Sequence, residues 1–407
     1  TAEPAVVPVA DSAEAPTPRG LTAALAPVLA DPNLGRFTGR ITDAMTGDEL
    51  WAQGVHVPMR PASVNKVLTS AAALLTLDRD ARLTTRVLAT SPGVVVLVGG
   101  GDQTLSAAPR GVDTWYRDAA RISDLADQVR RSGVAVETVQ VDVSAYSGPT
   151  MAPGWDPLDI DGGDIAPMES VMLDGGRTQP VSVDSARSRT PALDAGRALA
   201  VALGVDPAKV TVLPSAADGR EIAAVQSPPL MQRLREMMNF SDNVMAESTG
   251  REVAAATGHP HSFAGAVSAV LGALADAGID TDAAHLVDSS GLSVDDRLTA
   301  ETLDGVVNAA AGDDHARLRP LLDLLPIAGG SGTLSNRYLD TAAGRDAAGY
   351  LRAKTGSLTG TNSLAGIVTD SSGRVLTFAL LSNEAGPTGR TALDAFAATL
   401  RTCGCRT

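Results

Sequence analysis

Lysine is scarce in this chain. The 407 residues include 33 lysines and arginines, and only Lys66, Lys209 and Lys354 are lysines. A chain that uses arginine for nearly every positive charge has a chemical reason to keep lysine at a particular place. A lysine amine can lose its proton inside a protein, whereas an arginine guanidinium cannot. Lys66, in the segment PASVNKV, is therefore a candidate for proton transfer.

Cysteine and clustered histidine are also lacking. The two cysteines, Cys403 and Cys405, lie at the C-terminus, and the five histidines are scattered without an H-E-x-x-H motif. These spacings supply neither a disulfide framework nor a set of metal ligands. We expect no metal site and no cofactor. The two cysteines either form a C-terminal clip or remain free thiols.

The chain lacks basic clusters and long apolar runs. Its net charge is −14 and its pI is about 4.8, which argues against nucleic-acid binding. The strongest apolar run, VVVLV at 94–98, is far shorter than the roughly 20 residues of a membrane span, so we expect no transmembrane anchor. Residues 1–20 are rich in Pro, Ala and acids and begin with Thr rather than Met. They resemble the flexible linker left after signal-peptide removal, which indicates an exported protein of the periplasm, cell wall or extracellular space.

Hydrophobic spacing and turn residues predict a mixed α+β protein. We expect a hairpin near the N-terminus, a pair of helices interrupted at NFSDN, and a C-terminal antiparallel sheet covered by the last helix. In the middle of the chain, strands alternate with helices, and residues 144–190 read as long loops. The predicted segments are a hairpin at 35–54, helices at 62–77, 113–133 and 191–204, a broken helix at 229–258, and strands within 349–383.

The predicted helix at 62–77 places a hydroxyl beside the first lysine. Its apolar residues recur at helical spacing and would face the core. Ser63 falls in the first turn, and Lys66 follows three positions later on the same face. The amine of Lys66 can therefore reach the hydroxyl of Ser63.

Three short motifs occur in a characteristic order. They are Ser63-Val-Asn-Lys66, Ser241-Asp242-Asn243 and Lys354-Thr355-Gly356. Each motif alone is weak, but the ordered set is the signature of penicillin-recognising serine enzymes. Two of the three lysines of the chain belong to it.

The residue types fit nucleophilic catalysis. A serine hydroxyl becomes a good nucleophile when a neighbouring base takes its proton, and Lys66 can be that base if burial and the second cation of Lys354 lower its pKa. We expect Ser241 to pass a proton to the leaving amine and Asn243 to bind a substrate amide. The backbone N–H groups of Ser63 and Ser357 would form the oxyanion hole.

The third motif is suited to binding a peptide. Lys354 and Thr355 offer an ammonium and a hydroxyl to a substrate carboxylate. Gly356 would let a peptide backbone lie alongside the strand as an added strand.

With these motifs, the chain resembles the class C low-molecular-mass penicillin-binding proteins of the D-alanyl-D-alanine carboxypeptidase/endopeptidase family. Further likeness lies in LVGGGDQTL, APGWDPLD, DSSGLSVDDRLT and LPIAGGSGTLSNR. The resemblance implies an α+β transpeptidase-like domain, an antiparallel sheet flanked by helices, built from both ends of the chain around a smaller inserted α+β domain or domains. The expected division is a flexible tail at 1–20, transpeptidase-like parts at 21–80 and 228–407, and the insertion at 81–227.

The resemblance also implies a serine carboxypeptidase, with endopeptidase activity as a further expectation, that forms an acyl-enzyme on Ser63. Peptidoglycan peptides ending in D-Ala-D-Ala and β-lactam antibiotics are its expected partners. The family places an acid of the inserted domain beside the active site, where it meets the free amine of the substrate's diamino acid. Asp159, four residues after Trp155, is our candidate, and Trp155 is grouped with it as substrate-binding.

Two alternatives come from other functional classes. A β-lactamase would need a deacylating base after the second motif, where Glu247 and Glu252 occur, but we expect both on an exposed helix face. A non-catalytic peptidoglycan-binding scaffold would be expected to lack Ser63 or Lys66, and the chain has both.

Overall fold

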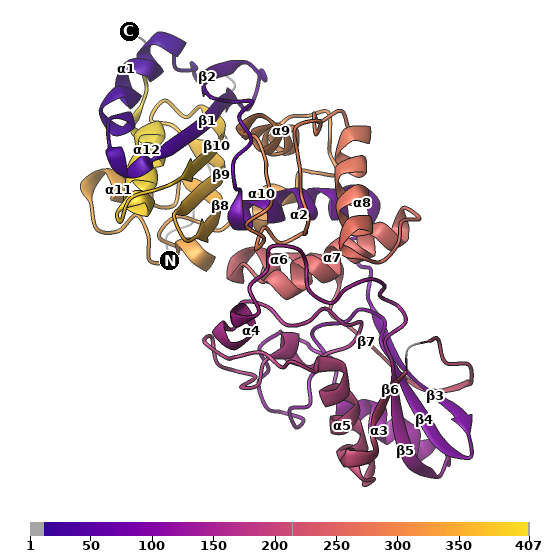
Figure 1. The fold of residues 1–407 in the computed structure, drawn as a ribbon. Coiled ribbons are helices and arrows are strands. Elements are labelled where there is room, and N and C mark those ends of the chain that lie inside the picture. The colour runs from indigo at the N-terminus through magenta and orange to yellow at the C-terminus, as the bar shows by residue number, and fades with distance from the viewer. Residues whose placement is uncertain (1–11, 214, 406–407) are drawn as a thin grey trace, which may run out of the picture.

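The computed structural model describes residues 12–213 and 215–405, which form two five-stranded sheets and their covering helices (Figure 1). The first sheet has the order β2-β1-β10-β9-β8, and every pairing in it is antiparallel. It joins the two ends of the chain, because β1 pairs with β10. The strands are β1 (Arg36–Asp43), β2 (Glu49–Gln53), β8 (Leu351–Leu358), β9 (Thr361–Thr369) and β10 (Val375–Asn383).

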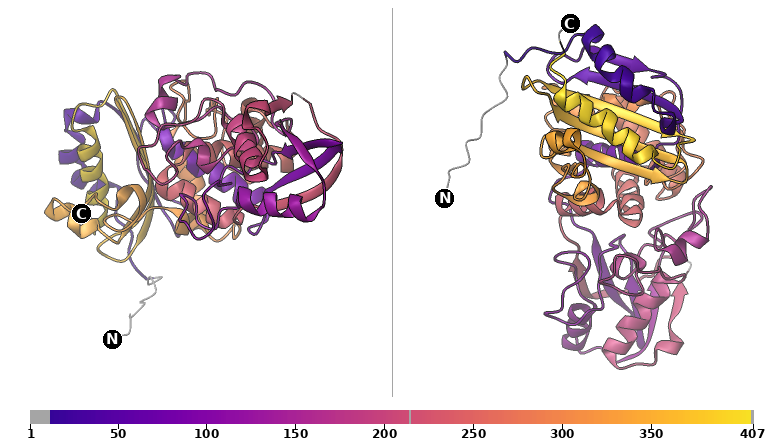
Figure 2. Two further views of the ribbon diagram at one scale, coloured as in Figure 1. Left: turned by 90° about the horizontal axis from the view of Figure 1, so that it is seen from below. Right: turned by 90° about the vertical axis from the view of Figure 1, so that its left-hand side faces the viewer.

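Helices cover both faces of this sheet, which lies between them as a middle layer (Figure 2). On one face, the terminal helices pack on a core that includes Ile41, Phe378 and Phe396. On the other face, a larger group of helices buries a second core that includes Leu68 and Leu381. The first group is α1 (Pro18–Leu29), α11 (Ala342–Ala347) and α12 (Gly389–Thr402), and the second is α2 (Asn65–Thr76), α6 (Leu230–Phe240), α7 (Asn243–Ala256), α8 (Phe263–Asp276), α9 (Ala300–Ala311) and α10 (Leu321–Leu324).

The second sheet is formed by the middle of the chain and lies apart from the first (Figure 1). Its order is β6-β5-β4-β3-β7, with β4, β5 and β6 parallel and β3 antiparallel to its two neighbours. Helices α3 (Ile122–Arg131) and α5 (Pro191–Leu203) pack on it around a separate core. The strands are β3 (Thr84–Ser91), β4 (Gly93–Val98), β5 (Val136–Asp142), β6 (Thr211–Leu213) and β7 (Arg220–Gln226). We propose that 81–227 forms the inserted domain.

Long loops connect β5 to α5, as the sequence predicts, and their one α-helix is α4 (Leu158–Gly162). Two predicted boundaries differ from the structure. Helix α1 begins at Pro18, inside the predicted tail, whose residues 1–11 lie outside the described part. The helix predicted at 113–133 begins only at Ile122, because the segment before it turns inward and buries Tyr116.

The cysteines, the possible metal ligands and the possible membrane spans can be compared with the sequence predictions. Cys403 and Cys405 form a disulfide, which is the clip rather than the free thiols. Within 12–213 and 215–405, no group of three or more His, Cys, Asp or Glu side chains is arranged to hold a metal ion. The helices in those residues are all too short or too polar to cross a bilayer.

A buried ion pair joins the end of β1 to the residue just before β10, its neighbour in the sheet. Asp43, at the end of β1, accepts hydrogen bonds of 2.8 and 2.9 Å from the guanidinium of Arg374, just before β10. Both side chains are buried. The same carboxylate also accepts from the backbone N–H groups of Met45 and Thr46 in the β1–β2 turn.

We expect Asp43→Ala to lower the free energy of unfolding by about 3–5 kcal/mol, because it leaves the buried Arg374 without a counter-charge. Glu221→Ala is the control, since it removes an acid from an exposed ion pair with Arg86, and we expect a loss below about 1 kcal/mol. Urea denaturation of both variants measures the difference. Equal losses would contradict a structural role for the buried pair.

Candidate active site

Ser63 and Lys66 lie where the chain enters helix α2. Ser63 is in a short 3-10 turn (Ala62–Val64), and the residue before it, Ala62, has a left-handed φ of 50°. Lys66 is fully buried, and its Nζ lies 2.9 Å from Ser63 Oγ. The predicted contact between amine and hydroxyl is therefore present in the structure.

Lys66 also joins two other parts of the chain. Its Nζ donates to Asn243 Oδ1 at 2.6 Å and to the backbone carbonyl of Ser290 at 2.8 Å. One amine thus contacts three segments that are far apart in the sequence. Three acceptors around one nitrogen fix its position.

The second motif occupies the predicted break between two helices. Ser241 ends α6 with a left-handed φ of 57°, and Asp242 caps α7 by accepting from the backbone N–H of Met245 at 3.0 Å. Asn243 begins α7, and its Nδ2 donates to the carbonyl of Asp164. The sharp break therefore turns Ser241 and Asn243 toward the two lysines.

The third motif lies on strand β8. Lys354 is fully buried, and its Nζ donates to Ser241 Oγ at 3.0 Å and to the carbonyl of Thr355 at 2.8 Å. The hydroxyl of Thr355 lies 2.8 Å from that of Thr333. The five residues predicted as catalytic thus form two hydrogen-bonded groups, Ser63–Lys66–Asn243 and Ser241–Lys354, joined through the 241–243 turn.

Gly356 packs closely against the segment that leads into Ser63. A Cβ at this position would meet Ser363 Oγ and would lie 2.7 Å from the carbonyl oxygen of Pro61 and 3.0 Å from Ala62 Cβ. The missing side chain therefore faces the segment that leads into Ser63. The close packing of β8 against this segment therefore requires glycine here.

Burial changes the proton affinity of both lysines. It lowers the pKa of Lys66 to about 8, and the nearby carboxylates of Asp288 and Asp242 partly oppose the shift. Burial also lowers the pKa of Lys354 well below its ordinary value, with smaller contributions from the positive charges of Lys66 and Arg337. The lowered pKa expected for Lys66 is thus due mainly to burial, and the repulsion between the lysines acts on Lys354.

A buried acid holds the loop behind Lys66. The carboxylate of Asp288 accepts from the backbone N–H groups of Ser290 and Ser293, at 3.0 and 2.8 Å, and from Trp155 Nε1 at 2.8 Å. Trp155 is 7% exposed and packs edge-on against Phe263, with ring centroids 5.0 Å apart. The prediction that Trp155 binds substrate is therefore not supported, because its indole is buried in support of the 288–293 loop.

The expectation that Glu247 and Glu252 lie on an exposed helix face is wrong. Glu247 is fully buried, and its Oε1 accepts from the backbone N–H of Ser289. The side chain of Glu252 is 11% exposed and forms an ion pair with the buried Arg233. The face of α7 that carries them packs inside the protein. Neither acid lines the cavity at Ser63.

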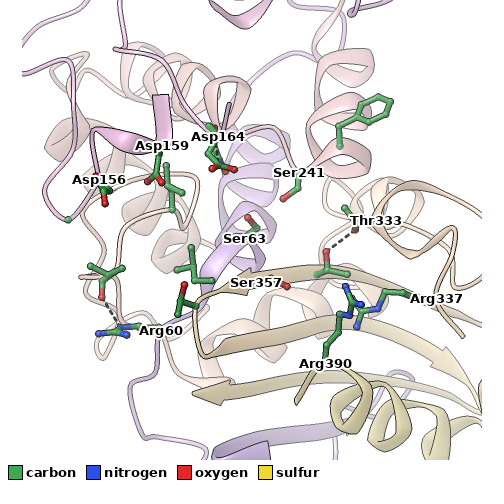
Figure 3. Close-up of a pocket in the computed structure, with 18 of the residues that line it drawn as sticks. Arg60, Ser63, Asp156, Asp159, Asp164, Ser241, Thr333, Arg337, Ser357 and Arg390 are labelled. Carbon is green, nitrogen blue, oxygen red and sulfur yellow. Dashed lines mark hydrogen bonds between the residues drawn. The ribbon is translucent and has the colours of Figure 1, made fainter. Parts of the chain in front are cut away.

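Ser63 faces a cavity of about 910 Å³. Figure 3 shows Asp156, Asp159 and Asp164 on one side of Ser63, and Thr333, Arg337 and Arg390 on the other. Ser241, Thr355 and Ser357 also line this cavity. Its volume is in the range of ordinary ligand sites.

The acidic side of the cavity includes the predicted Asp159, at the start of α4. Burial and the neighbouring charge of Asp164 raise the pKa of the Asp159 carboxyl. The sequence interpretation missed Asp164 and Thr333 as cavity residues. Both lie in or beside segments with family-like motifs, but nothing in their spacing distinguished them from neighbouring loop residues.

Comparison with known proteins identifies relatives along the whole chain. The chain is 74% identical over 408 residues to carboxypeptidase DacB of Mycolicibacterium smegmatis and 65% identical over 410 residues to carboxypeptidase Rv3627c of Mycobacterium tuberculosis. Both alignments cover 100% of this chain and 89% of the relative. The crystal structure of penicillin binding protein 4 (dacB) from Haemophilus influenzae matches with a TM-score of 0.75 at 23% identity, covering 94% of this chain and 98% of that one. That protein has also been solved with a β-lactam.

A family model gives the most specific assignment. The model of the D-Ala-D-Ala carboxypeptidase 3 (S13) family matches residues 21–187 and 182–400. The comparisons confirm the predicted fold class, family and enzyme class. The chain belongs to the D-Ala-D-Ala carboxypeptidase 3 (S13) family.

Proposed function

We propose that this protein is a serine D-Ala-D-Ala carboxypeptidase, with endopeptidase activity as well, that acts on peptidoglycan stem peptides through an acyl-enzyme on Ser63. The same serine would bind β-lactams covalently. The observation that carries the proposal is the hydrogen bond between Ser63 Oγ and the buried amine of Lys66, whose pKa is lowered to about 8. A nucleophile beside a base of that pKa is suited to acyl transfer near neutral pH.

In the proposed acylation, neutral Lys66 takes the proton of Ser63 as Oγ attacks the carbonyl carbon of the penultimate D-Ala. The backbone N–H groups of Ser63 and Ser357 would stabilise the oxyanion. The substrate amide would bind Asn243, whose side chain also holds Lys66 in place. Hydrolysis of the ester by water then frees the enzyme.

Ser241, held by a hydrogen bond from Lys354, would deliver a proton to the leaving amine. The proton that Lys66 took from Ser63 would then replace it. The hydroxyl of Thr355, with the neighbouring Thr333, would bind the terminal carboxylate of the substrate. That carboxylate would favour the protonated form of Lys354, whose pKa is low in the free protein. Peptides ending in D-Ala-D-Ala supply that carboxylate. We also propose that the protein is exported and works on the cell wall, where such peptides occur.

On the opposite side of the cavity, Asp159 would bind the free amine of the diamino acid in the stem peptide. Support comes from its position on the cavity wall near Asp156 and Asp164. Three acids, against the single Arg60 on that side, favour a cationic group there.

Incubation with penicillin should give one covalent adduct, detected by intact-protein mass, and peptide mapping should place it on Ser63. Ser63→Ala should abolish the adduct. Lys66→Arg should keep the fold and the positive charge but slow acylation by about 10²–10⁴-fold, because arginine cannot accept the proton. Labelling at another residue, or a near wild-type rate in Lys66→Arg, would refute the mechanism.

The rate of acylation should rise with pH and reach half its maximum near the Lys66 pKa of about 8. The sign follows from the base, because Lys66 is protonated and inactive below its pKa and neutral above it. Stopped-flow measurement with a chromogenic β-lactam gives the profile, and circular dichroism at each pH checks that the protein stays folded. A rate that does not change across this interval would assign the base role to another group.

Asp159→Asn should raise KM about 10-fold or more for stem peptides with a free side-chain amine, since it removes a charge-assisted hydrogen bond. Acylation by penicillin should be almost unchanged, because the drug lacks that amine. Asp161→Asn is the matched control on the same helix, at an exposed acid paired with Arg189. D-alanine release measures both variants. Equal loss on peptide and drug, or no loss on either, would show that Asp159 does not bind the substrate amine.

A further inference from the structure

A second cavity adjoins the candidate active site at Phe240. It has a volume of about 740 Å³, and Phe240 lines both cavities. Phe240 is 56% exposed, and its ring packs against that of Trp115, with ring centroids 5.3 Å apart. Trp115 in turn packs 4.0 Å from the guanidinium of Arg177. A large apolar side chain is thus held in an exposed position between the two cavities.

The second cavity lies on a defined side of the reacting serine. Phe240 directly precedes Ser241, and Asn239, which also lines the second cavity, packs against Gly332 beside Thr333. Ser241 and Thr333 are the groups proposed to meet the leaving amine and the terminal carboxylate. The acids that would meet the diamino acid are on the other side of Ser63 (Figure 3). The second cavity is therefore next to the leaving-group end of the substrate.

Three arginines line this cavity, and one of them, Arg121, donates to the backbone carbonyls of Ala108, Pro109 and Val112. Arg117 and Arg235 line the cavity and are exposed, and neither forms a salt bridge within the described part of the chain. A free guanidinium binds a carboxylate with two parallel hydrogen bonds.

The cavity is also lined by three acids, Asp113, Asp118 and Glu236, so that its acids equal its arginines in number. Glu236 accepts from the backbone N–H of Arg117 at 3.1 Å, and Asp118 accepts from Gln232 at 3.3 Å. Burial raises the pKa of the Glu236 carboxyl to about 7, so that part of it is uncharged at neutral pH. Because Arg121 is held by backbone carbonyls, Arg117 and Arg235 are the cationic side chains of the cavity that can meet an anionic ligand, and the charge of Arg117 also acts on Glu236.

We propose that this second cavity binds the leaving-group peptide of a cross-linked substrate, with Arg117 and Arg235 holding carboxylates of that peptide and Phe240 packing against its apolar part. The inference rests on the proposed endopeptidase activity, whose leaving group is a second peptide, and assigns the place where that peptide binds. The bond that breaks is the amide joining the two peptides. Ser63 Oγ takes the acyl carbon and gives its proton to Lys66, the amine leaves with a proton from Ser241 that the Lys66 proton then replaces, and water later hydrolyses the ester.

The test uses the full chain and two synthetic substrates: a single stem peptide ending in D-Ala-D-Ala, and a dimer of stem peptides cross-linked through the side-chain amine. We expect the variant Arg117→Ala/Arg235→Ala to raise KM for the dimer at least tenfold. D-alanine release from the single peptide and acylation by penicillin should change less than twofold. The matched control is Arg19→Ala/Arg79→Ala, which removes two exposed arginines that line neither cavity.

Binding measurements separate this proposal from the proposed chemistry. In a Ser63→Ala background, calorimetry should show that the dimer binds more tightly than the single peptide, and that Arg117→Ala/Arg235→Ala removes the difference. Equal affinities for the two substrates, or an unchanged difference in the double variant, would overturn the second binding site. Failure of penicillin to label Ser63 would instead refute the proposed function, and the binding result would still decide the site.

Discussion

The site depends on the burial of one amine, the Nζ of Lys66. This nitrogen contacts the hydroxyl of Ser63, the amide of Asn243 and the carbonyl of Ser290, and so ties together three segments of the chain. Burial disfavours its charged form, whereas the surrounding carboxylates favour it. The pKa of about 8 is the result of these opposing effects, and it leaves the amine able to exchange a proton near neutral pH.

The middle region of the chain supports this arrangement with two buried hydrogen bonds from aromatic side chains. Trp155 donates to Asp288, which holds the loop carrying the Ser290 carbonyl, and Tyr116 donates to Asp242 at 2.6 Å, next to Ser241. Each aromatic residue thus reaches an acid that positions a neighbour of Lys66 or Lys354. The middle region therefore fixes two of the segments that surround the lysines.

The sequence predicted the contacts that depend on local geometry. Ser63 and Lys66 meet because they are three residues apart on one helical turn. The burial of Glu247 was missed, because helical spacing identifies a face of α7 but not what packs on it, and here the loop at Ser289 does so. The same limit applies to Trp155 and Gly356, whose neighbours come from distant segments. Motif order predicted the fold and family, and tertiary contacts decided which side chains reach the cavity.

The distribution of the three lysines follows from the same physics. Lys209 is exposed, where arginine would serve equally well, but Lys66 and Lys354 are both fully buried beside the 241–243 turn. Two permanent charges so close together in a buried site would repel each other and lose their hydration without full compensation. Lysine relieves this cost by releasing a proton, which arginine cannot do. The residue type that makes the pair tolerable in the folded protein is therefore also the one that gives the site a base.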